Sequence, residues 1–90
     1  MKDINYYFLN FPSGDIIESE RWDDFQIDTT ASIVVNDILD LREQHEVIRK
    51  QLMDDFKTIR FLIVKRVFIH DAFNEETGGI FHLYLEPVFD

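Results

Sequence analysis

The three histidines of this chain are the side chains best suited to proton transfer or metal binding near neutral pH. His70 and His82 fall in two strand-like segments and face each other if those strands pair as predicted below. Asp71 or Glu86 could then complete a metal site, but a catalytic zinc needs three protein ligands and no spacing fixes the third. His45 interrupts an apolar pattern, which is more typical of a core histidine or a helix contact than of a catalytic base. We therefore expect no metal site and no catalytic histidine.

Nucleophilic and phosphate-binding chemistry has little support in the sequence. The chain contains no cysteine, which excludes disulfides, thiolate catalysis and thiolate zinc sites. None of Ser13, Ser19 and Ser32 lies in a nucleophile-elbow sequence. Three glycines in total, with Gly78-Gly79 as the longest run, cannot form a dinucleotide-binding fingerprint. We expect a protein that is not an enzyme and binds no cofactor.

Acidic residues are unevenly distributed along the chain. There are 18 acidic and 9 basic residues, for a formal net charge of −9. Residues 1–40 contain nine acids and two bases, residues 41–70 four acids and seven bases, and residues 71–90 five acids and no base. Such self-repulsion costs folding stability, which favours a compensating function. The alternative is a solvated surface that only confers solubility.

Two acidic stretches also contain aromatic residues, an arrangement typical of binding anchors surrounded by a charged rim. They are Trp22-Asp23-Asp24-Phe25 and Phe73-Asn74-Glu75-Glu76. The alternative for the first stretch is a loop attached to the core, which we favour for Phe25 and Ile27, whereas Trp22 fits either position. The predicted partner-binding residues are Asp15, Glu18, Glu20, Trp22, Asp23, Asp24, Asp28, Phe73, Glu75 and Glu76.

A surface of this charge is expected to occupy a basic site on another protein, such as a nuclease or another nucleic-acid-processing enzyme. In size and charge the chain resembles, as a class, immunity proteins against nuclease toxins and phage anti-restriction and anti-CRISPR inhibitors. Direct binding to nucleic acid or to an anionic membrane is not expected, because such partners require basic patches. We expect the basic residues of 41–70 to pair with the chain's own acidic surface.

The sequence also predicts a cytoplasmic location. Its longest uninterrupted apolar run, residues 61–64, is far shorter than the ~20 residues of a membrane-spanning helix. Residues 1–5 lack the basic and apolar regions of a secretory signal.

Ninety residues, 46% of them apolar, predict a single domain over residues 1–90. Residues 4–11 and 15–22 flank the turn sequence Pro12-Ser13-Gly14 and predict a first hairpin. Residues 58–70 and 80–89 flank Thr77-Gly78-Gly79 and predict a second hairpin. In the second, we expect Arg66 to pair with Glu86 and Val67 with Leu85.

Apolar residues between the two hairpins recur at spacings of three and four, which predicts an amphipathic helix over about residues 30–53. The positions are Ala31, Val34, Ile38, Leu41, Ile48 and Leu52, with His45 in the same stripe. Asp54 and Asp55 favour termination near Met53. Such a helix would be about 36 Å long, more than the ~30 Å diameter of a globule of this size. It would therefore overhang, break near Gln44-His45, or pack on a partner, as in a homodimer through the helix.

The predicted fold class is α+β, a mostly antiparallel sheet of two hairpins with one long helix between them, in the order β-β-α-β-β. This order is similar to that of ubiquitin-like β-grasp domains, in which the first and last strands pair in parallel at the centre of the sheet. The resemblance implies pairing of residues 6–9 with residues 83–88. It also implies an alternative function, a structural or interaction module, or a homodimer, that binds through apolar helix or strand-edge surfaces.

Overall fold

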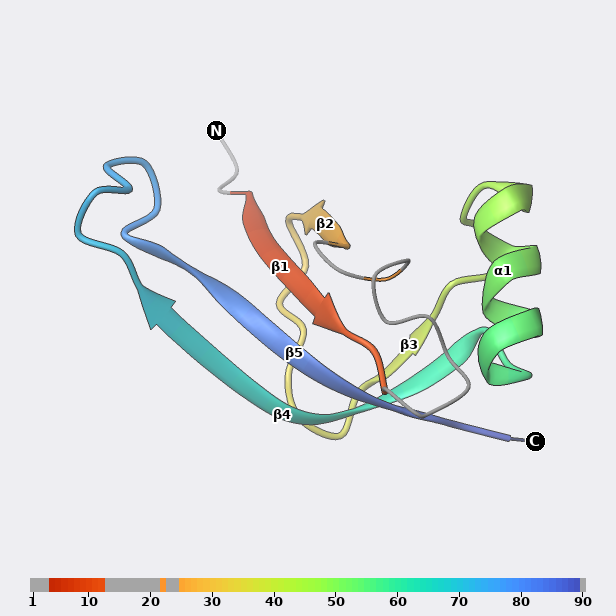
Figure 1. The fold of residues 1–90 in the computed structure, drawn as a ribbon. Helices are drawn as coiled ribbons and strands as arrows, with labels where there is room; N and C mark the ends of the chain where they lie inside the picture. The colour runs from red at the N-terminus through yellow and green to blue at the C-terminus, as the bar shows by residue number, and fades with distance from the viewer. Residues whose placement is uncertain (1–3, 13–21, 23–24, 90) are drawn as a thin grey trace.

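The computed structural model describes residues 4–12, 22 and 25–89. In these residues, five strands form one curled, mixed sheet in the order β2-β1-β5-β4-β3, accompanied by one short helix (Figure 1). The elements are β1 Asn5–Asn10, β2 Gln26–Thr29, β3 Ile38–Asp40, α1 Glu46–Phe56, β4 Arg60–His70 and β5 Gly79–Pro87. The α+β class is confirmed. The predicted order β-β-α-β-β is wrong, because a third strand precedes the helix.

The predicted helix over residues 30–53 is also wrong, since α1 has only 11 residues. It begins after His45, whose Nδ1 accepts a hydrogen bond from the backbone N–H of Val47 at 3.3 Å and so satisfies a free helix-end donor. The expected break near Gln44-His45 is therefore where the helix starts. Within the described residues, no helix has the length and apolar character needed to cross a membrane.

The helix ends at Phe56, later than predicted. Lys57 adopts the left-handed conformation, with φ 62°, and its backbone N–H donates to the Met53 carbonyl at 3.0 Å. Its ammonium group donates to the Asp54 carbonyl at 2.9 Å. These bonds satisfy two carbonyl groups of the last turn, and the helix continues through both aspartates to Phe56.

Local bonds explain why the segment before the helix is extended and turned. The β-branched run Ile33-Val34-Val35 favours extended backbone. Asn36 has φ 79°, a conformation that asparagine tolerates, and the Asp37 carboxylate accepts the Val34 N–H at 2.9 Å. The long apolar stripe that led us to expect a homodimer through the helix is therefore absent.

β1 lies next to β5 at the centre of the sheet and pairs with it in parallel, with Leu9 opposite Leu83. The parallel pairing of the first and last strands, expected from the β-grasp resemblance, is confirmed, but residues 7–10 pair with residues 81–84 and not residues 6–9 with residues 83–88. On its other side β1 pairs antiparallel with β2, where Tyr7 lies opposite Ile27. The strand predicted to pair with β1, residues 15–22, lies outside the described residues except for Trp22.

β4 and β5 form the expected second hairpin, but in a different register. Ile63 lies opposite Leu85, and a β-bulge follows before Lys65 pairs with Tyr84. As a result Arg66 lies opposite Leu83, and not opposite Glu86 as predicted. The turn that closes the hairpin and the bulge set this register, because each shifts every side chain beyond it.

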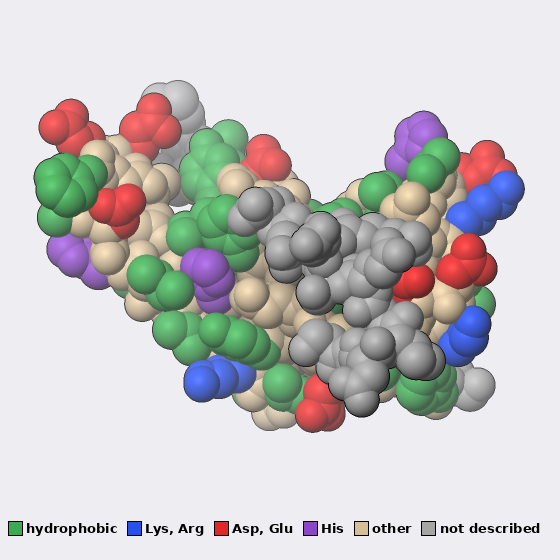
Figure 2. Space-filling view, in the orientation of Figure 1, with side chains coloured by type: hydrophobic (Ala, Val, Ile, Leu, Met, Phe, Trp, Pro, Cys, Tyr) green, Lys and Arg blue, Asp and Glu red, His purple; other side chains and the backbone are tan. Residues whose placement is uncertain are grey.

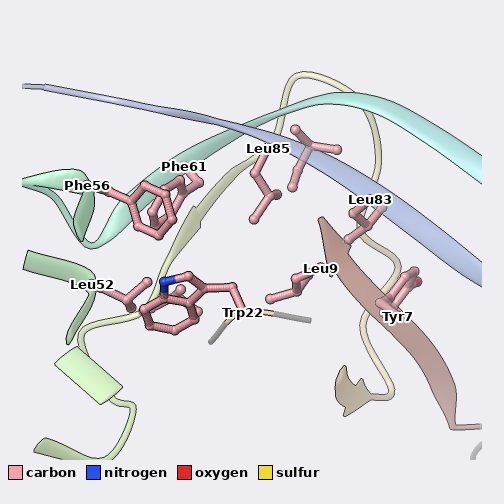
Figure 3. Close-up of a cluster of buried hydrophobic side chains, with 10 residues drawn as sticks. Tyr7, Leu9, Trp22, Leu52, Phe56, Phe61, Leu83 and Leu85 are labelled. Carbon is pink, nitrogen blue, oxygen red and sulfur yellow. The ribbon is translucent and has the colours of Figure 1, made fainter. Parts of the chain in front are cut away.

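The core runs along the inner face of the sheet, with α1 at one end and Tyr7 of β1 at the other (Figure 3). Leu52 and Phe56, one helical turn apart, are its contribution from α1. Trp22 and the sheet residues pack against them. The buried apolar residues are Tyr7, Leu9, Trp22, Leu41, Leu52, Phe56, Phe61, Ile63, Leu83 and Leu85.

Candidate protein-binding surface

The β4–β5 hairpin ends in a connection, residues 71–78, that we call the tip loop. Its two ends are joined by a hydrogen bond from the Asp71 N–H to the Gly78 carbonyl at 2.9 Å. The carboxylate of Asp71 accepts the Phe73 N–H at 2.9 Å, and its carbonyl accepts the Asn74 N–H at 3.1 Å. An aspartate that bonds to the backbone two residues later stabilises a tight turn.

The second half of the tip loop is held in the same way by Asn74. Its side-chain oxygen accepts the Thr77 N–H at 3.2 Å, and its carbonyl accepts the Gly78 N–H at 2.8 Å. Gly78 and Gly79 then take φ values of 70° and 146°, which residues with a Cβ rarely adopt. The first and second halves of the loop are thus each held by their own bonds to the backbone.

Phe73 projects from this loop with 95% of its surface exposed. Its near neighbours in the sequence, Asp71, Glu75 and Glu76, are also exposed. None of these three carboxylates forms an ion pair with another described residue. Figure 2 shows acidic side chains at the hairpin end, on the left, with no lysine or arginine beside them on this face. Burying a phenyl ring in a partner would stabilise a complex by about 1.5–3 kcal/mol.

The structure therefore brings together Phe73, Glu75 and Glu76 of the predicted partner-binding set, and Asp71 lies in the same loop. Asp28 is exposed on β2, whereas the tip loop joins β4 and β5. The remaining predicted carboxylates, Asp15, Glu18, Glu20, Asp23 and Asp24, lie outside the described residues.

Trp22 occupies the core, which was the alternative to its role as a partner contact. Its side chain is 5% exposed and lies among the other buried side chains (Figure 3). Its Nε1–H donates to Oδ2 of Asp55 on α1 at 2.6 Å. Its ring lies 5.1 Å from that of Phe11 and 5.7 Å from that of Phe56, between ring centres. In this conformation the indole cannot reach a partner. Phe25 also packs against the core, as expected.

Near the helix, the chain's bases pair with its own acids, as expected. Arg42 and Arg60 lie 2.7 Å and 3.5 Å from Oδ2 of Asp40, and Lys50 lies 3.6 Å from Glu46. The hydrogen bond from the Arg42 guanidinium lowers the pKa of the Asp40 carboxyl below its usual value, and the positive charges of both arginines add to this effect. Charge on this side of the molecule is thus partly neutralised within the chain.

Lys65 and Arg66 do not follow this pattern. The Arg66 guanidinium lies 4.0 Å from the centre of the Phe81 ring, and the Lys65 ammonium lies 5.4 Å from that of Tyr84. Both cations therefore rest on aromatic rings, and no described carboxylate forms an ion pair with either of them. The register predicted from the sequence, with Arg66 opposite Glu86, did not allow for these contacts.

The histidines are not arranged as a metal site within the described residues. His70 lies opposite Gly79, whereas His82 lies opposite Val67, so the expected pairing of the two imidazoles is wrong. The His82 ring stacks on Phe8, with 5.1 Å between ring centres. His45 caps α1, as described above, and is neither in the core nor at a helix contact.

An open hollow beside α1 is the other surface feature of note among the described residues. Its lining mixes both signs of charge with two apolar side chains, and consists of Glu46, Arg49, Lys50, Met53, Asp54 and Ile59. Because Lys50 and Glu46 pair with each other there, the hollow presents no uniform charge to a ligand.

No protein family, curated protein or solved structure is found to match this chain. A proposal for its function therefore rests on the chemistry of its surface.

Proposed function

We propose that this protein is a non-enzymatic binding protein whose tip loop enters a basic site on a partner protein. One observation carries the proposal, namely that a structured loop holds Phe73 95% exposed among acidic residues. A large apolar side chain in that position contributes nothing to the core, so burial in a partner is the role that its exposure fits.

The carboxylates give the loop its selectivity for a positive partner. The tip loop contains three acids, Asp71, Glu75 and Glu76, and no base, so the field around it is negative. Such a field steers a basic partner toward the loop and raises association rates by about 10- to 1000-fold at low salt. Phe73 then determines how long the complex lasts, since dissociation requires its ring to return to water.

We further propose that the basic site is one that normally binds nucleic acid. Sites that hold single-stranded nucleic acid combine cations for phosphates with surfaces on which bases stack. Carboxylates can occupy the positions of the phosphates, and a protruding phenyl ring can occupy the position of a base. Immunity, anti-restriction and anti-CRISPR inhibitors provide the class to which this function corresponds. Asp28 is exposed on β2, and the acidic residues 15–24 remain predicted contacts on the basis of their sequence alone.

A second candidate function is an interaction module that binds through the outer face of the sheet, the face away from α1. Ile69 and Tyr84 expose 47% and 37% of their surface, and paired strands place Val67 and His82 on one face beside Phe8. An apolar contact of this kind would be almost insensitive to salt.

Affinity capture with matched variants tests the proposal. The wild type is compared with Phe73→Ala, with a triple variant in which Asp71, Glu75 and Glu76 become the corresponding amides, and with Phe89→Ala as the control. Phe89 is 66% exposed and lies outside the tip loop, so its loss removes a similar exposed ring. We expect the first two variants to lose a basic, nucleic-acid-binding partner that the control retains. Capture of the same partners by all four proteins would refute the proposal.

A further inference from the structure

One edge of β4 is left unpaired by the described residues. β3 pairs with residues 60–62 of β4, and Ile63 bonds through its N–H and carbonyl to Asp37 and Asn36 at 2.9 Å and 2.8 Å. Beyond Ile63, β5 continues to pair along the other side of β4 as far as His70. Residues 64–70 therefore offer a run of backbone donors and acceptors to an incoming strand. We call this run the β4 edge.

The β4 edge has an amphipathic composition and the opposite charge to the rest of the molecule. It contains Lys65 and Arg66 and no acidic residue, in a chain with a net charge of −9. Its apolar side chains are half-exposed, with Val64, Phe68 and Ile69 showing 38%, 45% and 47% of their surface. Such an edge is a template for strand addition unless something protects it.

The two cations determine what the edge can accept. As consecutive strand residues they point to opposite faces of the sheet, Arg66 over Phe81 and Lys65 over Tyr84. Each is held by a ring, which leaves its N–H groups free to donate, because no ion pair of either cation is found in the described part of the chain. Like charges disfavour addition of a second copy of β4, whereas a strand with neighbouring acidic residues would be complementary on both faces.

We propose that the β4 edge binds an extended, acidic segment of a partner protein by strand addition. Backbone hydrogen bonds along residues 64–70 would supply the general attraction, and two consecutive acidic residues opposite Lys65 and Arg66 would set the register. Apolar residues on either side of the acidic pair would lie opposite Val64 and Val67. This surface is distinct from the tip loop, and its proposal does not depend on the function proposed above.

The test uses a synthetic peptide, Thr-Val-Glu-Glu-Val-Thr with blocked ends, titrated into the isotopically labelled full chain and followed by amide NMR shifts and hydrogen exchange. We expect shifts and new amide protection concentrated in residues 64–68, the part of the β4 edge that the peptide spans when its Glu-Glu pair lies opposite Lys65 and Arg66. The variant Lys65→Glu with Arg66→Glu should bind roughly tenfold more weakly and should instead accept the peptide with Lys-Lys at its centre. Rescue by the charge-swapped peptide would also show that the variant is folded.

The matched control changes the same total charge elsewhere, by Arg49→Glu with Lys50→Glu on α1, and should bind as the wild type does. N-methylation of alternate peptide amides should abolish binding, since it removes the backbone donors. The proposal would be overturned if the wild type bound the Glu-Glu and Lys-Lys peptides equally well. It would also be overturned if residues 64–70 were protected by self-association in the absence of peptide. The second result would assign the edge to another copy of this chain.

Discussion

Replacement of Trp22 by phenylalanine separates a core role from a partner-binding role for this side chain. The change keeps an aromatic ring among Phe11 and Phe56 but removes the Nε1–H that donates to Asp55 at 2.6 Å. Because Trp22 is 5% exposed, a mainly structural cost is expected.

The loss of stability can be estimated from the hydrogen bond that Trp22 donates to the Asp55 carboxylate. A hydrogen bond to a charged group contributes about 1.5–3 kcal/mol, and the smaller ring removes some packing as well. We therefore expect Trp22→Phe to lower the free energy of unfolding by about 2–3 kcal/mol. That is a large part of the ~5–15 kcal/mol typical of a whole domain, so Trp22→Ala is avoided. In a double-mutant cycle with Asp55→Asn, a coupling energy of about 1–2 kcal/mol is expected.

The assay is urea unfolding followed by circular dichroism, because the substitution removes the only tryptophan of the chain and with it the fluorescence signal. With a slope of about 1 kcal/mol per molar urea, the midpoint should fall by about 2–3 M. Partner capture by the folded variant should match the wild type. A change below about 0.5 kcal/mol together with loss of the partner would refute the core assignment and return Trp22 to the binding surface.

Two further predictions concern the hairpin turn and the charge cluster near the helix. Gly79→Ala should destabilise the protein by about 2–4 kcal/mol, because its φ is 146° and a Cβ would meet the Ile69 carbonyl oxygen at 2.2 Å. Gly78→Ala, where φ is 70° and the space is open, should cost only about 1 kcal/mol, and equal losses of thermal stability would contradict the geometry. Asp40 contributes stability above its unfolded pKa of about 3.9, and this contribution is lost as the pH falls through its lower folded pKa. Asp40→Asn should therefore lessen the acid-induced loss of stability below about pH 4 in a series of urea midpoints, whereas an unchanged pH profile would show that the pair with Arg42 contributes nothing.

The strands of the second hairpin could be predicted because the types of their residues and the turn between them both favour a hairpin. Residues 60–70 and 79–87 are rich in β-branched and aromatic side chains and flank a glycine-containing turn. Their register could not be predicted, since the bulge after Ile63 leaves no reliable sign in the sequence. The same error concealed the contacts of Lys65 and Arg66 with aromatic rings.

The long helix was predicted from a spacing of apolar residues that is compatible both with a helix and with the observed turn followed by a strand. Positions 31, 34, 38 and 41 match a helical stripe, but the backbone there is turned by Asn36 and Asp37 and continues into β3. The β-branched run at residues 33–35 and the Asn-Asp pair were the local signals against a helix. Given these, apolar spacing alone was not sufficient evidence.

Part of the candidate site could also be found from the sequence. Phe73, Glu75 and Glu76 were identifiable because a turn with an aromatic among acids has few core contacts available to it. Trp22 could not be assigned, because its burial depends on Asp55, 33 residues away in the chain. No local pattern encodes such a contact.

The central claim is that a negative tip loop with an exposed phenyl ring binds a positive site. It is tested most directly by the association rate of the wild type with its captured partner, measured over a series of salt concentrations. The account predicts a fall of about tenfold or more from low to high salt, a much smaller fall for Glu75→Gln with Glu76→Gln, and faster dissociation for Phe73→Ala. An association rate that stays constant across the series, with dissociation unaffected by the loss of Phe73, would contradict it.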